Sequence, residues 1–424
     1  MIYLLSATAG EVFKYIGFII VAILALMLMI IIHESGHYLA GKMLKFRIDE
    51  FSIGFGPAIF KRKNKKNGEV FSIRPIPIGG FCAFHGEDQE GEKDGEKTAN
   101  TSEDESVADI DENSTTKVDD IIGTTTLEGG EIVDAPANKN ESDSSAEEKK
   151  GPYFNDQPAW KRLIVLFSGA FFNFLSSIIF ITILFTAFGQ ILPVVVDAHD
   201  FVGQEQVFES GDVILSINGK QVNIMMPEDV SQAFNKAGDT ATFKVIRDGE
   251  IIEFTATRGE YIYEHTQKDE QGNETTITEN KVGYGVSLGT KWQKLDFFQA
   301  FGRAFGYAFF IVFKILASLG ALITGKIGLE SAGGTITVVK TIADMSAQGF
   351  GPFMYTISII SANLAVMNLL PIPALDGSRM TFTFIEMIFR KPVPRKVEGI
   401  IHTVGLVVLM LLVVFLDVFH LVNG

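Results

Sequence analysis

The feature that most constrains the fold is a junction: an uninterrupted apolar run from Tyr15 to Ile32 leads directly into His33-Glu34-Ser35-Gly36-His37. A run of this length is enough to cross a bilayer as a helix. On a helix, residues i and i+4 lie on one face, so His33 and His37 can bind one Zn²⁺ with Glu34 beside them. Placing an ionisable group near hydrocarbon costs free energy, and the groups found there usually have a function. The junction therefore predicts a membrane helix that carries a hydrolytic zinc site.

Four apolar stretches are long enough to be transmembrane helices: 15–41, 163–188, 353–372 and 400–418. Basic residues cluster after the first stretch, before the second and between the last two, and such clusters stay on the cytoplasmic side. The first helix then runs from outside to inside. Residues 190–296 are expected on the external side.

A fifth apolar stretch, 297–323, contains Arg303 and Lys314. If this stretch crossed, the basic loop 379–396 and the nearby Asp376 would be on the opposite side of the membrane from the histidines. We therefore expect four crossings, with 297–323 interfacial or re-entrant and its two basic residues at the lipid headgroups.

The net charge of −15 belongs to one segment. Residues 87–150 hold 21 Asp and Glu against 6 Lys and Arg, and the rest of the chain has 30 of each. A segment so acidic and poor in aromatic residues cannot bury enough apolar surface to fold. We expect a disordered cytoplasmic insertion, either an inert solvated loop or a binding site for an unknown cytoplasmic partner. No nucleic-acid partner is expected.

A second polar motif lies at the end of the third apolar stretch, in the segment Asn368–Gly377. Pro371 and Pro373 cannot continue a regular helix, and broken backbone at membrane depth is tolerated where it lines a cavity. Asp376 emerges at this break, at the level of the histidines. A catalytic zinc site usually has three protein ligands, so Asp376 is the candidate third ligand. The alternative is a helix-ending turn capped by Gly377.

These two motifs resemble those of the site-2 protease family of intramembrane zinc metalloproteases, which carry H-E-x-x-H in one membrane helix and N-x-x-P-x-P-x-L-D-G in a later one. Further pieces that resemble the family follow in the same order: Gly54–Pro57, Pro77–Phe81 and Gly169–Asn173. The resemblance covers most of the chain outside 87–150.

The resemblance implies roles for individual residues. The expected zinc ligands are His33, His37 and Asp376, and the expected general base is Glu34. Asn368 and Asn363 resemble the asparagines that hold the substrate backbone or the oxyanion; hydrogen bonds between helices are the alternative for both. Pro371, Pro373 and Gly377 are expected to shape the loop that carries the third ligand.

Short β-like pieces alternate with glycine and proline at Phe51–Phe55, Val70–Ile73 and Gly80–Phe84. They resemble the membrane-associated β-hairpin of the family. A strand edge near the zinc could hold an extended substrate by β-augmentation, so Gly80 and Phe81 are candidate substrate-binding residues. The alternative is a simple structured loop.

Residues 210–222 resemble the G-D-x-I-x-x-I-N-G-x-x-V signature of PDZ domains, with an Asn-Gly turn between two strands. A helix is expected at Met226–Ala237 and strands at Thr240–Arg247 and Ile251–Arg258. The small-residue stretch that often precedes this signature is missing, so a role in excluding bulky substrates is favoured over peptide binding.

The predicted fold is a polytopic α-helical membrane protein with four transmembrane helices, an external PDZ β/α domain and a cytoplasmic membrane-associated β-hairpin. The expected function is zinc-dependent cleavage of single-span membrane proteins in a bacterial inner membrane, in contact with the lipid bilayer; the resemblance implies substrates such as anti-sigma factors or signal-peptide remnants. Alternatives are a non-catalytic zinc-containing PDZ scaffold, which would normally have four protein ligands, and a transporter. The predicted segments are 1–44, 45–86, 87–150, 151–189, 190–290, 291–330, 331–378 and 379–424.

Overall fold

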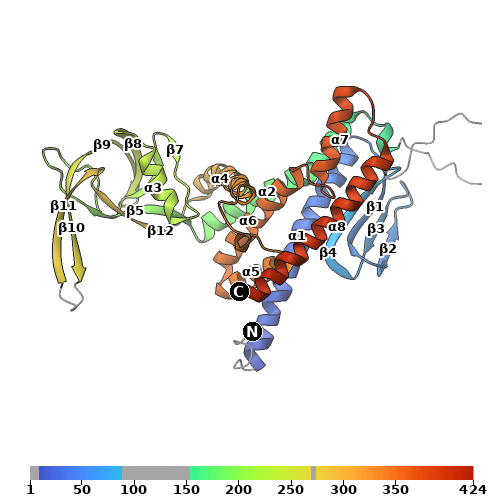
Figure 1. Cartoon of the computed structure of the whole chain (residues 1–424), viewed down its shortest axis with the longest axis horizontal. Coiled ribbons are helices and arrows are strands. Elements are labelled where there is room, and N and C mark those ends of the chain that lie inside the picture. Colours follow the sequence, from blue (N-terminus) through green and yellow to red (C-terminus); the bar gives the residue numbers. More distant parts are fainter. Residues whose placement is uncertain (1–8, 88–152, 269–273, 424) are drawn as a thin grey trace, which may run out of the picture.

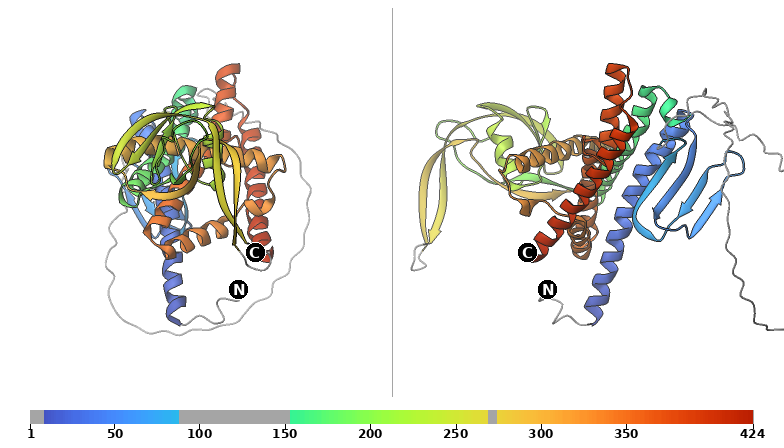
Figure 2. Two further views of the ribbon diagram at one scale, coloured as in Figure 1. Left: turned by 90° about the vertical axis from the view of Figure 1, so that its left-hand side faces the viewer. Right: turned by 45° about the vertical axis from the view of Figure 1, so that its right-hand side comes forward.

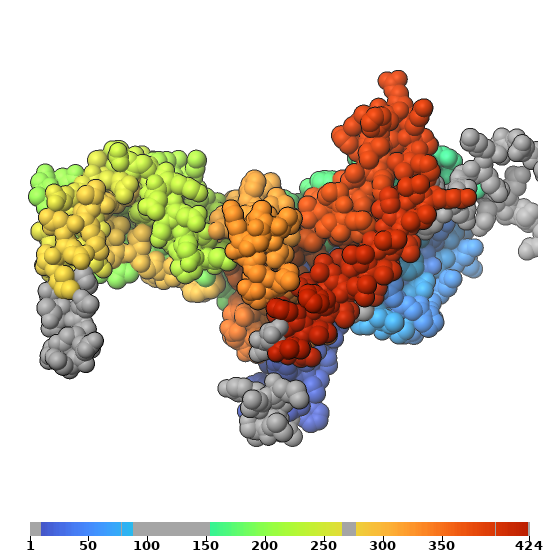
Figure 3. Space-filling model, in the orientation of Figure 1, coloured from blue at the N-terminus to red at the C-terminus, as the bar shows by residue number. Residues whose placement is uncertain are grey.

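The computed structural model describes residues 9–87, 153–268 and 274–423. Except for Glu87 at one edge, the predicted acidic insertion lies outside the described residues. The described parts form a helical bundle, a small sheet along one side of it and a β-rich domain on the other side (Figure 1). In the space-filling view the β-rich domain and the bundle are two lobes that meet at helix α4 (Figure 3).

Helix α2 (Ala159–Ala187) is the centre of the bundle. In its most apolar stretch a share of 56% is buried inside the protein. The corresponding share is 11% in α1 (Ala9–Met43) and 6% in α8 (Arg395–Asn423). Five described helices are long and apolar enough to cross a membrane by length and composition: α1, α2, α4 (Phe297–Ile323), α6 (Phe350–Leu369) and α8. The shorter helices are α5 (Thr335–Gln348), α7 (Asp376–Phe389), η2 (Phe154–Asp156) and η3 (Leu329–Ser331).

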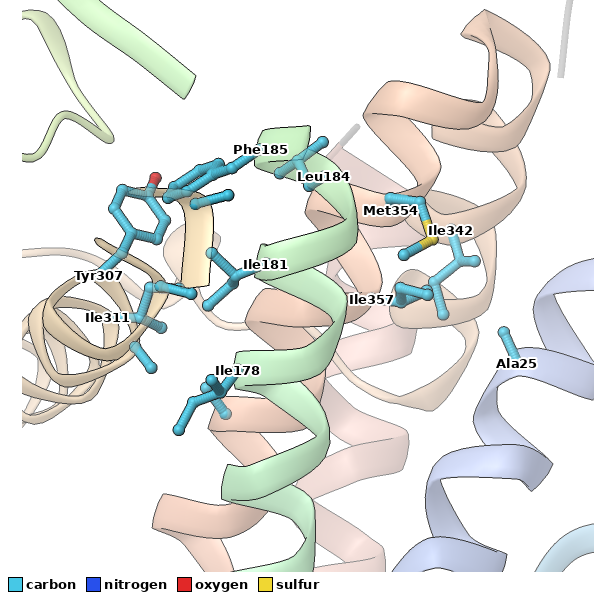
Figure 4. Close-up of a cluster of buried hydrophobic side chains, with 14 of the residues drawn as sticks. Ala25, Ile178, Ile181, Leu184, Phe185, Tyr307, Ile311, Ile342, Met354 and Ile357 are labelled. Carbon is cyan, nitrogen blue, oxygen red and sulfur yellow. The ribbon is translucent and has the colours of Figure 1, made fainter. Parts of the chain in front are cut away.

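The main core of the bundle forms where α2, α4, α5 and α6 meet. Ile181, Leu184 and Phe185 of α2 are almost fully buried there, beside Tyr307 and Ile311 of α4 (Figure 4). The outer faces of α1 and α8 instead expose leucine, valine and phenylalanine side chains. This arrangement is the one expected of helices that face lipid on one side and each other on the other side.

The sheet beside α1 has four strands: β1 (Ile48–Phe55), β2 (Phe60–Lys63), β3 (Val70–Ile73) and β4 (Ile76–Phe84). Their order is β2-β3-β1-β4, with β1 and β3 parallel and the other pairs antiparallel. The three predicted β-like pieces all lie in strands, but the unit is larger than the predicted hairpin. Strand β2 lies between β1 and β3 in the chain and pairs antiparallel with β3 at the edge of the sheet. The chain therefore reverses its direction twice after β1, which makes β3 parallel to β1.

The β-rich domain is built on a sheet of order β12-β5-β6-β8-β9, with β7 paired to β6. Asn218 and Gly219 both have positive φ in the predicted turn. Strand β8 lies at Thr240–Arg247, as predicted, and the predicted helix is the shorter α3 (Pro227–Asn235). A long hairpin, β10–β11, extends away from the domain and was not predicted (Figure 1). The remaining elements are β5 (Gln190–Ala198), β6 (Val213–Ile217), β7 (Lys220–Gln221), β9 (Glu250–Thr257), β10 (Gly259–Lys268), β11 (Glu274–Gly283) and β12 (Val286–Gln293).

Helix α4 runs across the bundle and not along it: it is seen end-on in Figure 1 and lengthwise, crossing the direction of α1, after the quarter turn of Figure 2. One of its faces holds the β-rich domain. Arg303 donates hydrogen bonds to Gln190 Oε1 (2.6 Å) and to the carbonyls of Leu215 (3.0 Å) and Val222 (2.9 Å). Lys314 forms an ion pair with Asp229 of α3.

The two basic residues of α4 therefore bind the domain, and the expectation that they meet lipid headgroups is wrong. The reason is that this face of α4 packs on carbonyl and carboxylate groups left available by the domain. Burial raises the pKa of Asp229, but hydrogen bonds from Lys314 and from the backbone of Met225 and Met226 outweigh it and lower that pKa below its ordinary value. The other face of α4 is an exposed phenylalanine stripe at i, i+4 spacing: Phe297, Phe301, Phe305, Phe309 and Phe313.

Candidate active site

The side chains of His33, His37 and Asp376 converge on one point. Nε2 of His33 lies 2.9 Å from Oδ2 of Asp376, Nε2 of His37 lies 3.2 Å from the same oxygen, and the two nitrogens are 3.2 Å apart. The donor atoms around one tetrahedral Zn²⁺, with bonds of about 2.0–2.1 Å, are about 3.3 Å from each other. The three side chains therefore have the spacing of ligands to a single ion, and they form a candidate metal site among the described residues.

Helix α1 supplies the two histidines, and a break between α6 and α7 supplies the aspartate. Helix α6 ends at Leu369, before Pro371 and Pro373, as the prolines predict. The chain turns through Ala374, which has φ 74°, and its backbone N–H donates to Nδ1 of His402 on α8 (3.2 Å). Asp376 then opens α7.

Gly377 allows this tight turn. A Cβ at Gly377 would lie 2.1 Å from the carbonyl oxygen of Leu370, a distance that no real side chain tolerates. Gly377 is the second residue of α7 and not a cap of α6, so the alternative interpretation as a helix-ending cap is wrong. Its missing side chain lets the start of α7 fold back on the end of α6, which brings Asp376 to the histidines.

The outer nitrogens of both imidazoles are held by polar groups. Nδ1 of His37 donates to the carbonyl of Val165 (2.8 Å), which leaves Nε2 available as a ligand atom. Nδ1 of His33 lies 3.3 Å from the carboxamide of Asn173 and 3.4 Å from that of Asn368. Both contacts fix the ring orientations that a metal-binding histidine requires.

Asn173 gives an independent test of whether the site fits a metal. Its Oδ1 is buried and has no hydrogen-bond partner among the described residues. If Nε2 of His33 binds a metal, Nδ1 carries a proton, and rotating the Asn173 carboxamide by half a turn brings Oδ1 to accept it. Metal binding thus explains an otherwise unsatisfied buried acceptor.

Helices α1 and α2 touch at two glycines beside the histidines. A Cβ at Gly36 would lie 2.4 Å from the carbonyl oxygen of Ser168. A Cβ at Gly169 would lie 2.3 Å from Nε2 of His37 and 2.7 Å from Cε1 of His33. Small residues allow membrane helices to approach closely. Here they let the α2 backbone form one wall of the site, which leaves the histidines only 9% and 7% exposed.

Glu34 lies on the side of the site that faces β4. A cavity of ≈ 360 Å³ lies there, and Cys82 of β4 lines it together with Glu34. Gly80 of β4 is close as well, since a Cβ on it would lie 3.5 Å from Cγ of Glu34. The cavity is lined by Glu34, His37, Phe81, Cys82, Ala83, Phe84, Glu87, Leu166, Asp376 and Arg379.

A second polar cavity of ≈ 310 Å³ shares Glu87, Leu166 and Arg379 with the first. Glu87 and Arg379 form an ion pair where the two cavities meet. His402, which holds the loop before Asp376, lines the second cavity. The two cavities therefore adjoin at this ion pair, and the second lies toward the end of the bundle where α2 begins.

The structure brings together most of the predicted site residues, but Asn363 is an exception. Asn368 reaches His33, whereas Asn363 lies five positions earlier on α6 and points about 140° away around the helix. Within the described residues the side chain of Asn363 makes no hydrogen bond, and its role stays a prediction. Gly169, Asn173 and His402 were not singled out as site residues. An asparagine or histidine inside an apolar stretch is a signal that could have found the last two.

Comparison with known proteins agrees with this geometry. Residues 21–412 match the model of peptidase family M50. Two similar proteins are each named "Putative zinc metalloprotease": one from Fusobacterium nucleatum is 27% identical over 94% of this chain and 97% of its own length, and one from Clostridium perfringens is 26% identical over 95% and 97%. The zinc metalloprotease RasP of Oceanobacillus iheyensis is 28% identical over 93% of this chain and 96% of its own. The chain therefore belongs to peptidase family M50, the site-2 protease family of zinc metalloproteases.

Proposed function

We propose that this metalloprotease cuts single-span membrane proteins or peptides inside or near the bilayer, at a site near the cytoplasmic face of a bacterial inner membrane. The observation that carries the proposal is the convergence of His33, His37 and Asp376 at one end of long apolar helices. A structural zinc site is normally closed by four protein ligands. The described residues supply three, which leaves a position for water or substrate and argues against a scaffold without turnover.

Each site residue has a proposed role. His33, His37 and Asp376 would hold Zn²⁺, which when bound lowers the pKa of water and polarises a carbonyl group. Glu34 would take the proton of the attacking water and deliver it to the leaving amine. Its position between the ligands and β4 supports this role.

Asn368 would hold the substrate backbone or the oxyanion, as an amide N–H can. Its carboxamide lies against Nδ1 of His33, so it would have to exchange this contact for a substrate carbonyl. Asn173 is placed to hold His33 alone when that exchange occurs.

The substrate would bind as an extended strand beside β4. This strand is at the edge of its sheet in the described structure, and Gly80, Phe81 and Cys82 lie next to Glu34. Backbone groups of an edge strand are available for pairing with another chain. A substrate helix unwound along β4 would present its peptide bonds to Glu34 and the metal.

Contacts at the two ends of the bundle support four crossings. At the external end, Tyr15 of α1 donates to Asp344 of α5, and Asp417 of α8 accepts from the backbone of Ile336 and Thr337 (α5). At the cytoplasmic end, Arg162 of α2 pairs with Glu386 of α7. Helix α4 joins the external domain to α5, and its transverse course fits an interfacial position in which the phenylalanine stripe meets lipid.

The external domain would act as a PDZ-like unit that excludes substrates with bulky external parts. Contacts with Arg303, Tyr307 and Lys314 of α4 fix the position of the domain relative to the helical bundle. Anti-sigma factors and signal-peptide remnants are the substrate classes that the family resemblance implies.

The deciding experiment compares purified wild type with Glu34→Gln on a model transmembrane substrate. We expect the variant to keep its zinc, measured by elemental analysis, and to lose cleavage, because Glu34 is assigned as base and not as ligand. Cleavage at the wild-type rate by the zinc-loaded variant would refute the assignment.

A further inference from the structure

A second concave site lies on the opposite face of α1 from the zinc ligands. It is a groove of ≈ 800 Å³ that is lined by residues of α1, of strands β1, β2 and β3 and of the turn between β2 and β3. Ser35 and Tyr38 line it from α1, and at 100° per residue they point away from His33 and His37. We propose that this groove binds an anionic phospholipid, with the headgroup phosphate at its basic rim and an acyl chain on its apolar floor.

The rim is strongly basic. Arg62, Lys65 and Lys66 are exposed, and they lie together in β2 and the turn that follows it. Among the residues that line the groove, the single acidic group is Glu69, and its carboxylate is paired with Lys42 of α1. Glu69 therefore does not cancel the charge of the rim, which is available to an anion.

The floor is apolar and aromatic. Tyr38, Phe51 and Phe71 form a continuous row, with ring centroids 5.5 Å apart for the first pair and 6.1 Å for the second. A soluble phosphate compound would gain nothing from this surface. A phospholipid has both a charged head and an apolar chain, so it matches the rim and the floor together.

The sheet is basic at one end and apolar at the other, just as one leaflet of a membrane is charged at its surface and apolar inside. In the β2–β3 pair, Lys63 faces Val70 at the basic end and Phe60 faces Ile73 at the other. At that other end Ile59 is 73% exposed, with Ile73 and Ile76 also exposed. Lys42, near the C-terminal end of α1, is beside the basic end through its pair with Glu69. The basic rim thus lies at headgroup level while the apolar end points into hydrocarbon.

The test measures lipid retention by native mass spectrometry of the full chain in detergent, titrated with phosphatidylglycerol or with phosphatidylcholine. The test variant is Arg62→Gln/Lys65→Gln/Lys66→Gln. The matched control is Lys220→Gln/Lys236→Gln/Lys291→Gln, which removes the same charge from exposed positions of the external domain. A charge-preserving variant, Arg62→Lys/Lys65→Arg/Lys66→Arg, separates loss of charge from loss of structure.

We expect wild type and the matched control to retain phosphatidylglycerol in preference to phosphatidylcholine. Each basic group near an anionic surface is worth about fivefold in affinity, so the test variant should bind phosphatidylglycerol about 100-fold more weakly. The charge-preserving variant should bind as wild type does. Glu34→Gln should also bind normally, so this result is independent of the proposed protease mechanism.

Three results would overturn the proposal. One is equal retention of the two lipids by wild type. Another is equal retention of phosphatidylglycerol by wild type and the test variant. The third is full displacement of the lipid by millimolar glycerol 1-phosphate, which would mean a site for a free phosphate compound that needs no acyl chain.

Discussion

Replacing Gly169 by alanine should destroy the metal site while leaving every motif residue in place. The added Cβ would lie 2.3 Å from Nε2 of His37, and ordinary contact begins at 3.4 Å, so a gap of about 1.1 Å must open. Helix α2 cannot easily retreat from α1, since its other faces are buried against α4 and α6 in the core of the bundle. The imidazole of His37 must move instead.

The size of the effect follows from the tolerance of metal coordination. Metal–ligand distances are held to about 0.2 Å, so a displacement of about 1 Å removes His37 as a ligand. Disturbing only the outer contacts of a ligand costs about 10–100-fold in metal affinity. Loss of the ligand itself should therefore weaken zinc binding at least about 100-fold, or about 3 kcal/mol. Overpacking should cost the fold about 1–3 kcal/mol.

The assay is zinc competition with a chromophoric chelator, followed by elemental analysis of the purified protein. Gly17→Ala is the matched control, because the same change in α1 meets nothing within 4 Å. We expect the control to bind zinc and cleave substrate as wild type does. Wild-type zinc affinity in Gly169→Ala would show that the helices are free to separate here, and the account of the site as a tight contact of α1 and α2 would be wrong.

Asp376→Ala should lower zinc occupancy together with activity; full occupancy at normal affinity would remove Asp376 from the ligand set. Deleting residues 90–149 should leave the melting temperature and turnover nearly unchanged, because Asn155 is hydrogen-bonded to the carbonyls of Gly86 and Glu87 (both 3.0 Å) and keeps the two ends together; a zinc-loaded but inactive deletion would make the insertion part of the mechanism. In a Cys82→Ser background, a cysteine at Lys326 should react with an impermeant maleimide from outside intact cells and one at Lys396 only after permeabilisation, whereas the reverse pattern would separate the proposed ligands across the bilayer.

The convergence of the three proposed metal ligands could be predicted from the sequence because each depends on local geometry. The spacing of His33 and His37 places both on one face of any helix. Pro371 and Pro373 end α6 wherever it packs, so Asp376 emerges at a predictable break. Strand Thr240–Arg247 was also predictable, because its alternation of buried and exposed residues is local.

The rest depends on how helices and strands pack against each other. Nothing near Gly169 in the chain indicates that its Cα faces an imidazole of α1. Arg303 has the pattern of an interfacial arginine, but the oxygens that it binds belong to residues 81 to 113 positions earlier in the chain. The β10–β11 hairpin is rich in polar residues and gives no periodic signal. Such features need the tertiary structure.

The glycine contact between α1 and α2 has a consequence for how relatives of this chain are judged. A sequence can keep H-E-x-x-H and the later aspartate and still have lost its chemistry, if a methyl group has entered at the position of Gly169. Motif searches would count that sequence as an enzyme. The residue at the position of Gly169 should therefore be examined beside the proposed ligands when the activity of a relative is judged.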